Sequence, residues 1–288
     1  QRLEVGTKIV AMIAAREETI ISTDEAVYGM TFVGGDFVFS FRLLATDSGA
    51  AGLNTMISID GDVYWLGKRN FFKYDGIVQE LPCPVQYYVF DRMQKNFIEK
   101  TTVGHNKAFK EVTWFYVSND NTAGTINPEP DSYVTYNYAE NAWTVGTLDR
   151  TVWSDSFGAR KVPFAIDPYG YLYEHETGTS ADGAAMNSYI EGSPREISEN
   201  GETLYMVDQV IPDVTMTTST SLSLYMNTRK FPNSTETVKG PFTITSSTEK
   251  VSTRAKGRQI SMKFQSTGLD DEWTLGDFRV NSRQDGLR

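Results

Sequence analysis

The stretch ISIDGDVYWLGKRNFFKY, residues 57–74, contains the pattern that decides the fold. Apolar and polar residues alternate on both sides of the Asp60-Gly61 pair, and a second break at residues 67–70 leads into an aromatic segment. Alternation with a period of two is typical of strands, and an Asp-Gly pair between such runs is a strong hairpin signal. The stretch therefore predicts consecutive antiparallel strands joined by tight turns.

Related hairpins recur along the first part of the chain. A second clear copy covers residues 165–175, and weaker copies cover residues 32–41 and 134–145. The spacing of the two clear copies fits about two units of the ~40–50-residue period of four-stranded propeller blades. Radial stacking of such sheets buries both of their apolar faces. We predict β-propeller-like blades for residues 1–200, complete or incomplete as a ring; a generic meander of hairpins is the alternative.

The last part of the chain has fewer aromatic residues and longer, more regular strands. Leu222, Leu224 and Met226 alternate with polar residues, as do Ile260 and Phe264 with their neighbours. This pattern is typical of strands with one dry and one wet face. The sequence therefore predicts a C-terminal β-sandwich over residues 201–288 and an all-β fold class for the whole chain.

Composition narrows the classes of function. The chain has 288 residues, 12% aromatic residues, a single cysteine and a net charge of −10. Aromatic and β-branched residues favour strands, and one cysteine cannot form an intrachain disulfide. The acidic balance is the reverse of what a phosphate-neutralising surface requires, which argues against sequence-specific nucleic-acid binding. No apolar run approaches the ~20 residues that span a bilayer.

The sequence offers few groups for catalysis. His105 lies in a polar segment, and His175 lies between Glu174 and Glu176. In an extended strand the two glutamates share a face that His175 does not, which makes a poor metal site. We expect an acidic patch at a strand end.

Two further groups are weak candidates. The acidic run at residues 270–272 lacks the spacing of a calcium loop, and such residues are usual in a turn. Cys83 lies between two prolines without a histidine near it in sequence, so we expect a small buried residue rather than a nucleophile. No nucleophile elbow, P-loop or dinucleotide fingerprint is present. The sequence predicts no catalytic, cofactor-binding or metal-binding residues and no cofactor.

Two sets of residues are candidates for an interface. Trp65 and Phe71 could fill an interface or stack a sugar, although aromatic residues at strand spacing more often form a blade core. Arg254, Lys256 and Arg258 occupy alternate positions and are expected on one strand face. They fit an interface or an anionic contact as well as a solvated strand edge.

Several segments carry a resemblance to a known family when they are taken in order. They are VYWL at residues 63–66, FFKYDG at 71–76, LPCPV at 81–85, VF at 89–90, WT at 143–144, YEHE at 173–176, TRAKGRQ at 253–259, DEWTLGD at 271–277 and RQDG at 283–286. Over residues 32–288 the chain resembles the C-terminal portion of tail hub or nozzle proteins of short-tailed bacteriophages, which are also called packaged-DNA stabilisation proteins.

The resemblance implies a virion structural protein without enzymatic activity. Such a protein is made in the host cytoplasm and forms a ring homo-oligomer around the DNA exit channel of the phage tail. Its partners would be neighbouring tail proteins (adaptor, tail fibre or spike, needle), with non-specific passage of DNA, retention of the packaged genome until ejection, and no membrane. Against the family pattern, the start at Gln1 leads us to expect that early blades are missing or are supplied by another segment.

Two other classes stay open. A propeller-type tail protein that binds or hydrolyses glycans would need a cleft with paired acids and aromatic residues. A host-surface adhesin would expose aromatic residues on outer loops such as residues 118–131.

Overall fold

The computed structural model describes residues 3–35, 37–121, 128–197 and 202–287. The chain forms two compact units, residues 1–177 (unit 1) and residues 178–288 (unit 2), and each is described by itself. This boundary precedes the one at 200/201 that the sequence suggests. The reason is long-range pairing: β16 (Ser188–Glu191) and β17 (Arg195–Glu196) pair with β23 (Gln259–Ser266).

Within the described residues, unit 1 consists mainly of four antiparallel sheets, which we call blades 1 to 4. Blade 1 contains β1 (Ile9–Ala14), β2 (Thr19–Thr23), β3 (Ala26–Phe32) and β4 (Phe39–Thr46). Blade 2 contains β5 (Met56–Ile59), β6 (Asp62–Leu66), β7 (Phe71–Tyr74) and β8 (Val78–Leu81). Blade 3 contains β9 (Thr102–Asn106), β10 (Glu111–Tyr116), β11 (Ser132–Asn137) and β12 (Ala142–Thr147). Blade 4 contains β13 (Val152–Ser154), β14 (Phe164–Ile166) and β15 (Leu172–Glu174).

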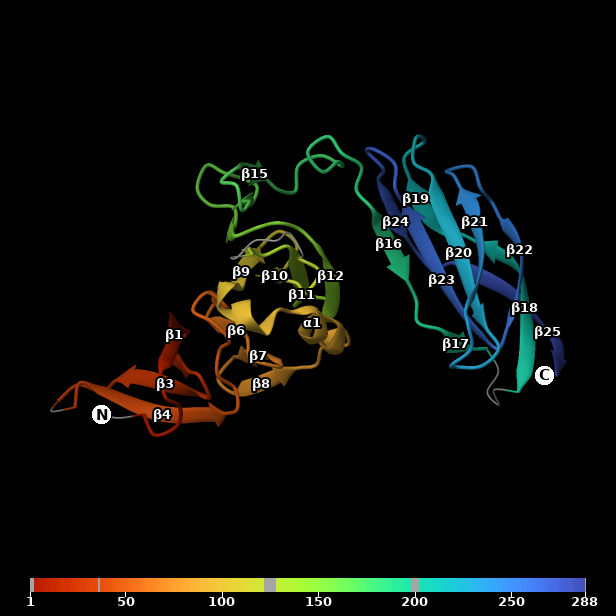
Figure 1. The fold of residues 1–288 in the computed structure, drawn as a ribbon. Helices are drawn as coiled ribbons and strands as arrows, with labels where there is room; N and C mark the ends of the chain where they lie inside the picture. The colour runs from red at the N-terminus through yellow and green to blue at the C-terminus, as the bar shows by residue number, and fades with distance from the viewer. Residues whose placement is uncertain (1–2, 36, 122–127, 198–201, 288) are drawn as a thin grey trace. The chain divides into compact units, whose positions relative to one another are not determined.

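The blades are arranged as in a propeller. Each is a meander in which sequential strands pair, and contacts between neighbouring blades bring their first strands together: β1 lies beside β5, β5 beside β9, and β9 beside β13. Sheets joined along their first strands radiate from a common axis, as propeller blades do. Figure 1 shows this succession from β1 to β15. The predicted all-β, propeller-like architecture is confirmed.

Local turn chemistry explains the hairpins. At the β5–β6 turn, Asp60 has φ +52° and Gly61 has φ +95°. Positive φ at both central residues is the requirement of a type I′ turn, whose twist matches that of the strands it joins. In the β3–β4 hairpin, Gly34 and Gly35 also have positive φ, whereas Asp36 lies outside the described residues. Glycine adopts this conformation without the strain that a Cβ atom would bring.

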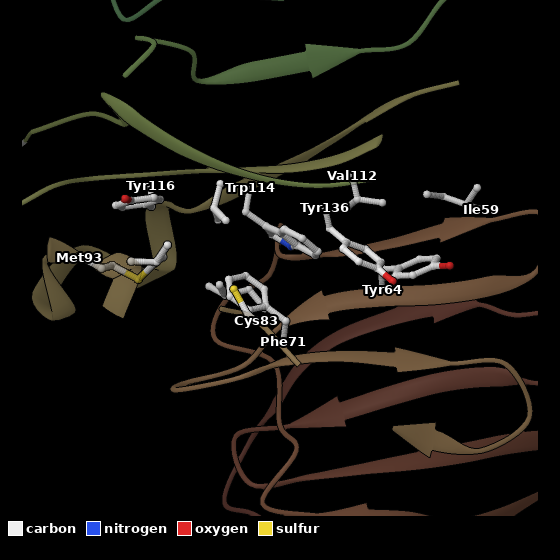
Figure 2. Close-up of a cluster of buried hydrophobic side chains, with 12 residues drawn as sticks. Ile59, Tyr64, Phe71, Cys83, Met93, Val112, Trp114, Tyr116 and Tyr136 are labelled. Atoms are coloured by element: carbon white, nitrogen blue, oxygen red, sulfur yellow. The ribbon is translucent and has the colours of Figure 1, made fainter. Parts of the chain in front are cut away.

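The largest core lies between blades 2 and 3. Figure 2 shows Tyr64 and Phe71 of blade 2 pointing toward Trp114 and Tyr136 of blade 3. The rings of Phe71 and Trp114 lie 5.1 Å apart, and the indole of Trp114 donates to the backbone oxygen of Thr55 at 3.0 Å. Burial of each such side chain stabilises the fold by about 1.5–3 kcal/mol. The two blades are therefore held in a fixed relation by packing.

Blades 2 and 3 are linked by a short helical segment. It contains α1 (Gln86–Arg92) and the 3₁₀ helix η1 (Lys95–Lys100). Val89 and Met93 bury their side chains in the core between the same two blades. No helix of the described chain combines the length and apolar character that crossing a membrane requires.

Unit 2 is a β-sandwich, as the sequence predicts. One sheet contains β16, β17, β23, β20 (Leu222–Arg229) and β21 (Thr237–Ile244). The other contains β22 (Val251–Gly257), β18 (Thr203–Ile211) and β25 (Arg279–Leu287), and β19 (Val214–Met216) pairs with β24 (Trp273–Leu275). Inward-facing residues of both sheets, among them Val207, Leu224 and Phe264, form one core.

Candidate functional site

Both histidines are held within unit 1 by hydrogen bonds. The Nδ1 atom of His105 lies 3.1 Å from Oδ2 of Asp155, and its Nε2 lies 3.1 Å from the hydroxyl of Tyr138. Burial lowers the pKa of His105 below its ordinary value. A neutral imidazole that donates from Nδ1 and accepts at Nε2 satisfies both contacts. His105 therefore ties β9 of blade 3 to the segment after β13 of blade 4.

His175 is also held by a hydrogen bond to one of its ring nitrogens. Its Nε2 accepts a hydrogen bond from Nε of Arg150 at 3.0 Å, and its ring packs on Trp153 at 4.7 Å. Burial, followed by the charge of Arg150, lowers the pKa of His175 to about 4. The imidazole is neutral at neutral pH and serves as an acceptor, so it is not available as a general base at Nε2.

Glu174 and Glu176, the two residues of the acidic patch expected around His175, have separate partners. Strand β15 ends at Glu174, and Glu176 has φ +58°, so the chain turns where an extended strand was expected. Glu174 lies 3.6 Å from Arg160, while Glu176 accepts from the amide of Asn106 at 3.0 Å. Burial raises the pKa of Glu176. The prediction that the two glutamates share a strand face is therefore wrong.

The acidic turn and the cysteine have structural environments. Asp271 accepts hydrogen bonds from the hydroxyl of Ser266 and from the backbone N–H of Gly268, and so closes its own turn. Within the residues that the structure describes, no group of three or more His, Cys, Asp or Glu residues could hold a metal ion. Cys83 is buried in the core between blades 2 and 3, and burial raises the pKa of its thiol to about 11. A protonated, buried thiol is a poor nucleophile.

Trp65 and Phe71 do not lie on a surface. Both side chains are fully buried, Trp65 between blades 1 and 2 and Phe71 between blades 2 and 3. Trp65 donates from its indole nitrogen to the backbone oxygen of Ser48 at 2.7 Å. The interface role suggested for them is corrected to a core role, because both faces of blade 2 are covered by neighbouring blades.

The basic residues Arg254, Lys256 and Arg258 lie on both sides of a corner where the chain passes from one sheet of the sandwich to the other. Arg254 and Lys256 are exposed on the outer face of β22, where Lys256 forms an ion pair with Asp285 at 2.8 Å. After Gly257 the chain passes into β23 of the other sheet, and the guanidinium of Arg258 lies over the ring of Phe231. The three side chains therefore do not share one face, although Arg254 and Lys256 stay accessible to a partner.

A different surface has the properties of an interface. We call the face of a blade that packs on the next blade in the chain its back face, and the opposite face its front face. The front face of blade 1 is therefore the face that does not pack on blade 2. On the front face of blade 1, cross-strand pairs align Tyr28 with Leu43, Met30 with Phe41 and Phe32 with Phe39. Four large side chains of this face are exposed: Met12 (62%), Phe32 (73%), Phe39 (44%) and Leu43 (46%). Contiguous apolar surface of this kind marks an interaction site.

The back face of blade 4 is also apolar and exposed. Val152, Ile166 and Leu172 are aligned across its three strands, and Val152 and Leu172 are each about half exposed. Phe164 shares this face with Ile166, and the exposed ring of Phe157 lies 6.0 Å from that of Phe164. The opposite face of this blade carries Trp153 and packs on blade 3. The two ends of the blade series thus each present an apolar sheet face.

These two faces were missed at the sequence level, although a signal was present. In β3 and β4 large apolar residues occupy alternate positions, and Val27 and Leu44 add apolar side chains to the opposite face. Such strands have two faces to bury. Only the structure shows that blade 2 covers one face of blade 1 and leaves the other exposed.

Comparisons with known proteins add little about function. No family model and no curated protein matches the chain. Among solved structures, the chain is similar to an exo-β-1,3-galactanase from Phanerochaete chrysosporium in complex with β-1,3-galactotriose, with 10% identity, a TM-score of 0.31, and coverage of 94% of this chain and 80% of that chain. A glycoside hydrolase matches with 9% identity, a TM-score of 0.26, and coverage of 94% and 83%. At such low identities and TM-scores, neither likeness carries an argument about activity.

Proposed function

We propose that this protein is a structural component of a phage tail, a hub or nozzle subunit that works by assembly and not by catalysis. The observation that carries the proposal is the pair of exposed apolar faces at the two ends of the blade series. Apolar faces of this kind are stabilised when another surface covers them. A protein that exposes apolar sheet faces is suited to become part of a larger wall.

The titratable groups near the blades support a structural role. His105, His175 and Glu176 each use their polar atoms on neighbours within unit 1. A glycan-hydrolysing protein would need two carboxylates that face each other across a cleft. Among the residues that the structure describes, the groove of about 460 Å³ in unit 2 is lined mainly by apolar residues and by no carboxylate. The smaller hollow of about 390 Å³ beside α1 has Asp91 as its one described carboxylate.

The charge of the chain fits a wall past which DNA moves. Unit 1 has 23 acidic and 15 basic side chains, a net charge of −8, and unit 2 has 14 and 12, a net charge of −2. An acidic wall repels phosphates and so disfavours adhesion of the duplex. The resemblance to tail hub and nozzle proteins adds the finer part of the proposal: a ring of copies below the portal and adaptor that retains DNA until ejection.

Immunoelectron microscopy tests this function. Purified virions of the phage that encodes the chain are labelled with an antibody raised against unit 2, with an antibody against a head protein as the control. We expect label at the tail tip and the chain in the mass spectrum of the purified particles. Absence of the chain from particles that carry complete tails would refute the proposal.

A further inference from the structure

We propose that Asn106, Glu111 and Glu176 bind a calcium ion between blade 3 and the segment that follows the last strand of blade 4. All three residues belong to unit 1, so the inference uses only contacts within that unit. It goes beyond the proposed function and does not depend on it, because a cation that binds the folded chain stabilises it wherever the chain works.

Strand pairing places Asn106 and Glu111 side by side on the back face of blade 3. They are direct partners across β9 and β10, and directly opposed residues of an antiparallel pair point to the same face of the sheet. The alternation of β10 puts Phe115 on this face as well, and its ring stacks on that of Trp153 in blade 4. Asn106 and Glu111 therefore point toward blade 4.

Glu176 reaches the same place from the other blade. It lies just after the end of β15, and its Oε1 accepts a hydrogen bond from Nδ2 of Asn106 at 3.0 Å. Because Asn106 is the strand partner of Glu111, this hydrogen bond brings the two carboxylates near each other. Burial, followed by the charge of Glu176, raises the pKa of Glu111.

The described chain does not neutralise these two carboxylates. Among the described residues, neither glutamate forms an ion pair, and Glu111 accepts no hydrogen bond. Burial also raises the pKa of Glu176, although the hydrogen bond from Asn106 opposes the shift. Like charges in a partly buried site disfavour ionisation, so a cation between the two carboxylates would stabilise their charged forms.

The amide oxygen of Asn106 is an independent sign of a ligand. Asn106 is only 4% exposed, and its Oδ1 atom is buried without a hydrogen-bond partner in the described chain. This oxygen belongs to the same planar amide whose nitrogen contacts Glu176, so it lies at the carboxylate pair. A buried acceptor without a partner is destabilising, and coordination of a cation by Oδ1 would remove that cost.

The donor set favours calcium. Two carboxylates and an amide supply only oxygen atoms, which hard cations prefer, and Ca²⁺ accepts bidentate carboxylates and an irregular arrangement where Mg²⁺ requires a nearly octahedral one. An amide oxygen takes the place of a third carboxylate here, so the site is not one of the groups of three acidic, histidine or cysteine ligands that were absent above. Glu174 takes no part, because it lies beside Arg160.

Isothermal titration calorimetry with CaCl₂ measures the binding, on the full chain after removal of metal with EDTA and dialysis. We expect one site with a Kd below about 1 mM. Glu111→Gln and Glu176→Gln each keep the size of the side chain and remove a charge, and each should raise the Kd at least about 10-fold, since affinity follows the number of charged ligands. Glu140→Gln, at an exposed carboxylate between β11 and β12 of blade 3, is the matched control and should bind as wild type does.

Thermal unfolding separates cation binding from a purely structural role of the glutamates. In EDTA, Glu111→Gln should melt at or above the temperature of wild type, because it removes a repulsion. In about 5 mM CaCl₂, wild type and Glu140→Gln should melt several degrees higher than in EDTA, and Glu111→Gln should not. NaCl at equal ionic strength is the control for screening. A wild-type chain with neither binding heat nor a melting shift overturns the inference, as does a shift that NaCl reproduces or that Glu111→Gln retains.

Discussion

Replacement of Gly104 by alanine should loosen blade 4 from blade 3. Gly104 lies in β9 directly against Trp153, and a Cβ atom built there would come within 2.4 Å of Cγ, 2.5 Å of Cδ1 and 2.7 Å of Cβ of that residue. The indole cannot move freely, because its Nε1 donates to the backbone oxygen of His105 at 2.9 Å and its ring stacks on Phe115. Overpacking of this kind costs about 1–3 kcal/mol. We expect the upper half of that range.

Urea unfolding followed by circular dichroism measures the change, with the transitions of the two units fitted separately. Gly192→Ala in unit 2 is the matched control, because the nearest atom to its built Cβ, the backbone oxygen of Met262, is 4.0 Å away. The control should stay within about 0.5 kcal/mol of wild type. In a Trp153→Ala background the added methyl group has room, so Gly104→Ala should cost little there. An equal cost in both backgrounds, or a neutral Gly104→Ala, would refute the packing between blades 3 and 4.

Three further outcomes follow from the burial of single groups. Phe71→Ala should destabilise unit 1 by about 3–5 kcal/mol in urea unfolding, whereas Tyr87→Ala, on an exposed position, should change it by less than about 0.5 kcal/mol; similar values would argue against the core between blades 2 and 3. The Cys83 thiol, with its pKa raised to about 11 by burial, should react with a thiol reagent only after unfolding, and rapid labelling of the native chain would contradict its placement. His175 should titrate near pH 4 by NMR. The variant His175→Gln assigns the signal, because it removes the resonance of His175 and leaves that of His105. Since its pKa in the folded chain lies below the ordinary 6.5, its contribution to stability is complete above pH 6.5 and is lost as the pH falls toward 4; a native pKa near 6.5 would refute the assignment.

Local patterns in the sequence predicted much of the fold. The alternation around Asp60-Gly61 predicted the hairpin and a tight turn at that pair, and the structure adds that both residues have the positive φ of a type I′ turn. The sandwich followed from the regular alternation in β20 and β23, where one face is dry and the other is wet. The all-β class can therefore be predicted from strand alternation and turn residues, which are local features of the sequence.

Long-range features were not accessible in the same way. The division of the chain at 177/178 depends on β16 pairing with β23, which no local pattern encodes. The corner at Gly257, where β22 leaves one sheet and β23 begins in the other, separates Arg258 from Arg254 and Lys256. A strand pattern shows that a face is apolar, but which neighbour covers it depends on the order of the blades. For the same reason the sequence does not distinguish Trp65 from Phe39. Both are aromatic residues within predicted strands, but Trp65 is buried and Phe39 is exposed.

Cryo-electron microscopy of purified virions of the phage that encodes the chain tests the central claim most directly. The account predicts several copies of the chain in the tail, with a neighbouring surface over the exposed apolar face of β1, β3 and β4. Tails whose density contains no copy of this chain, or in which that face stays open to solvent, would contradict it.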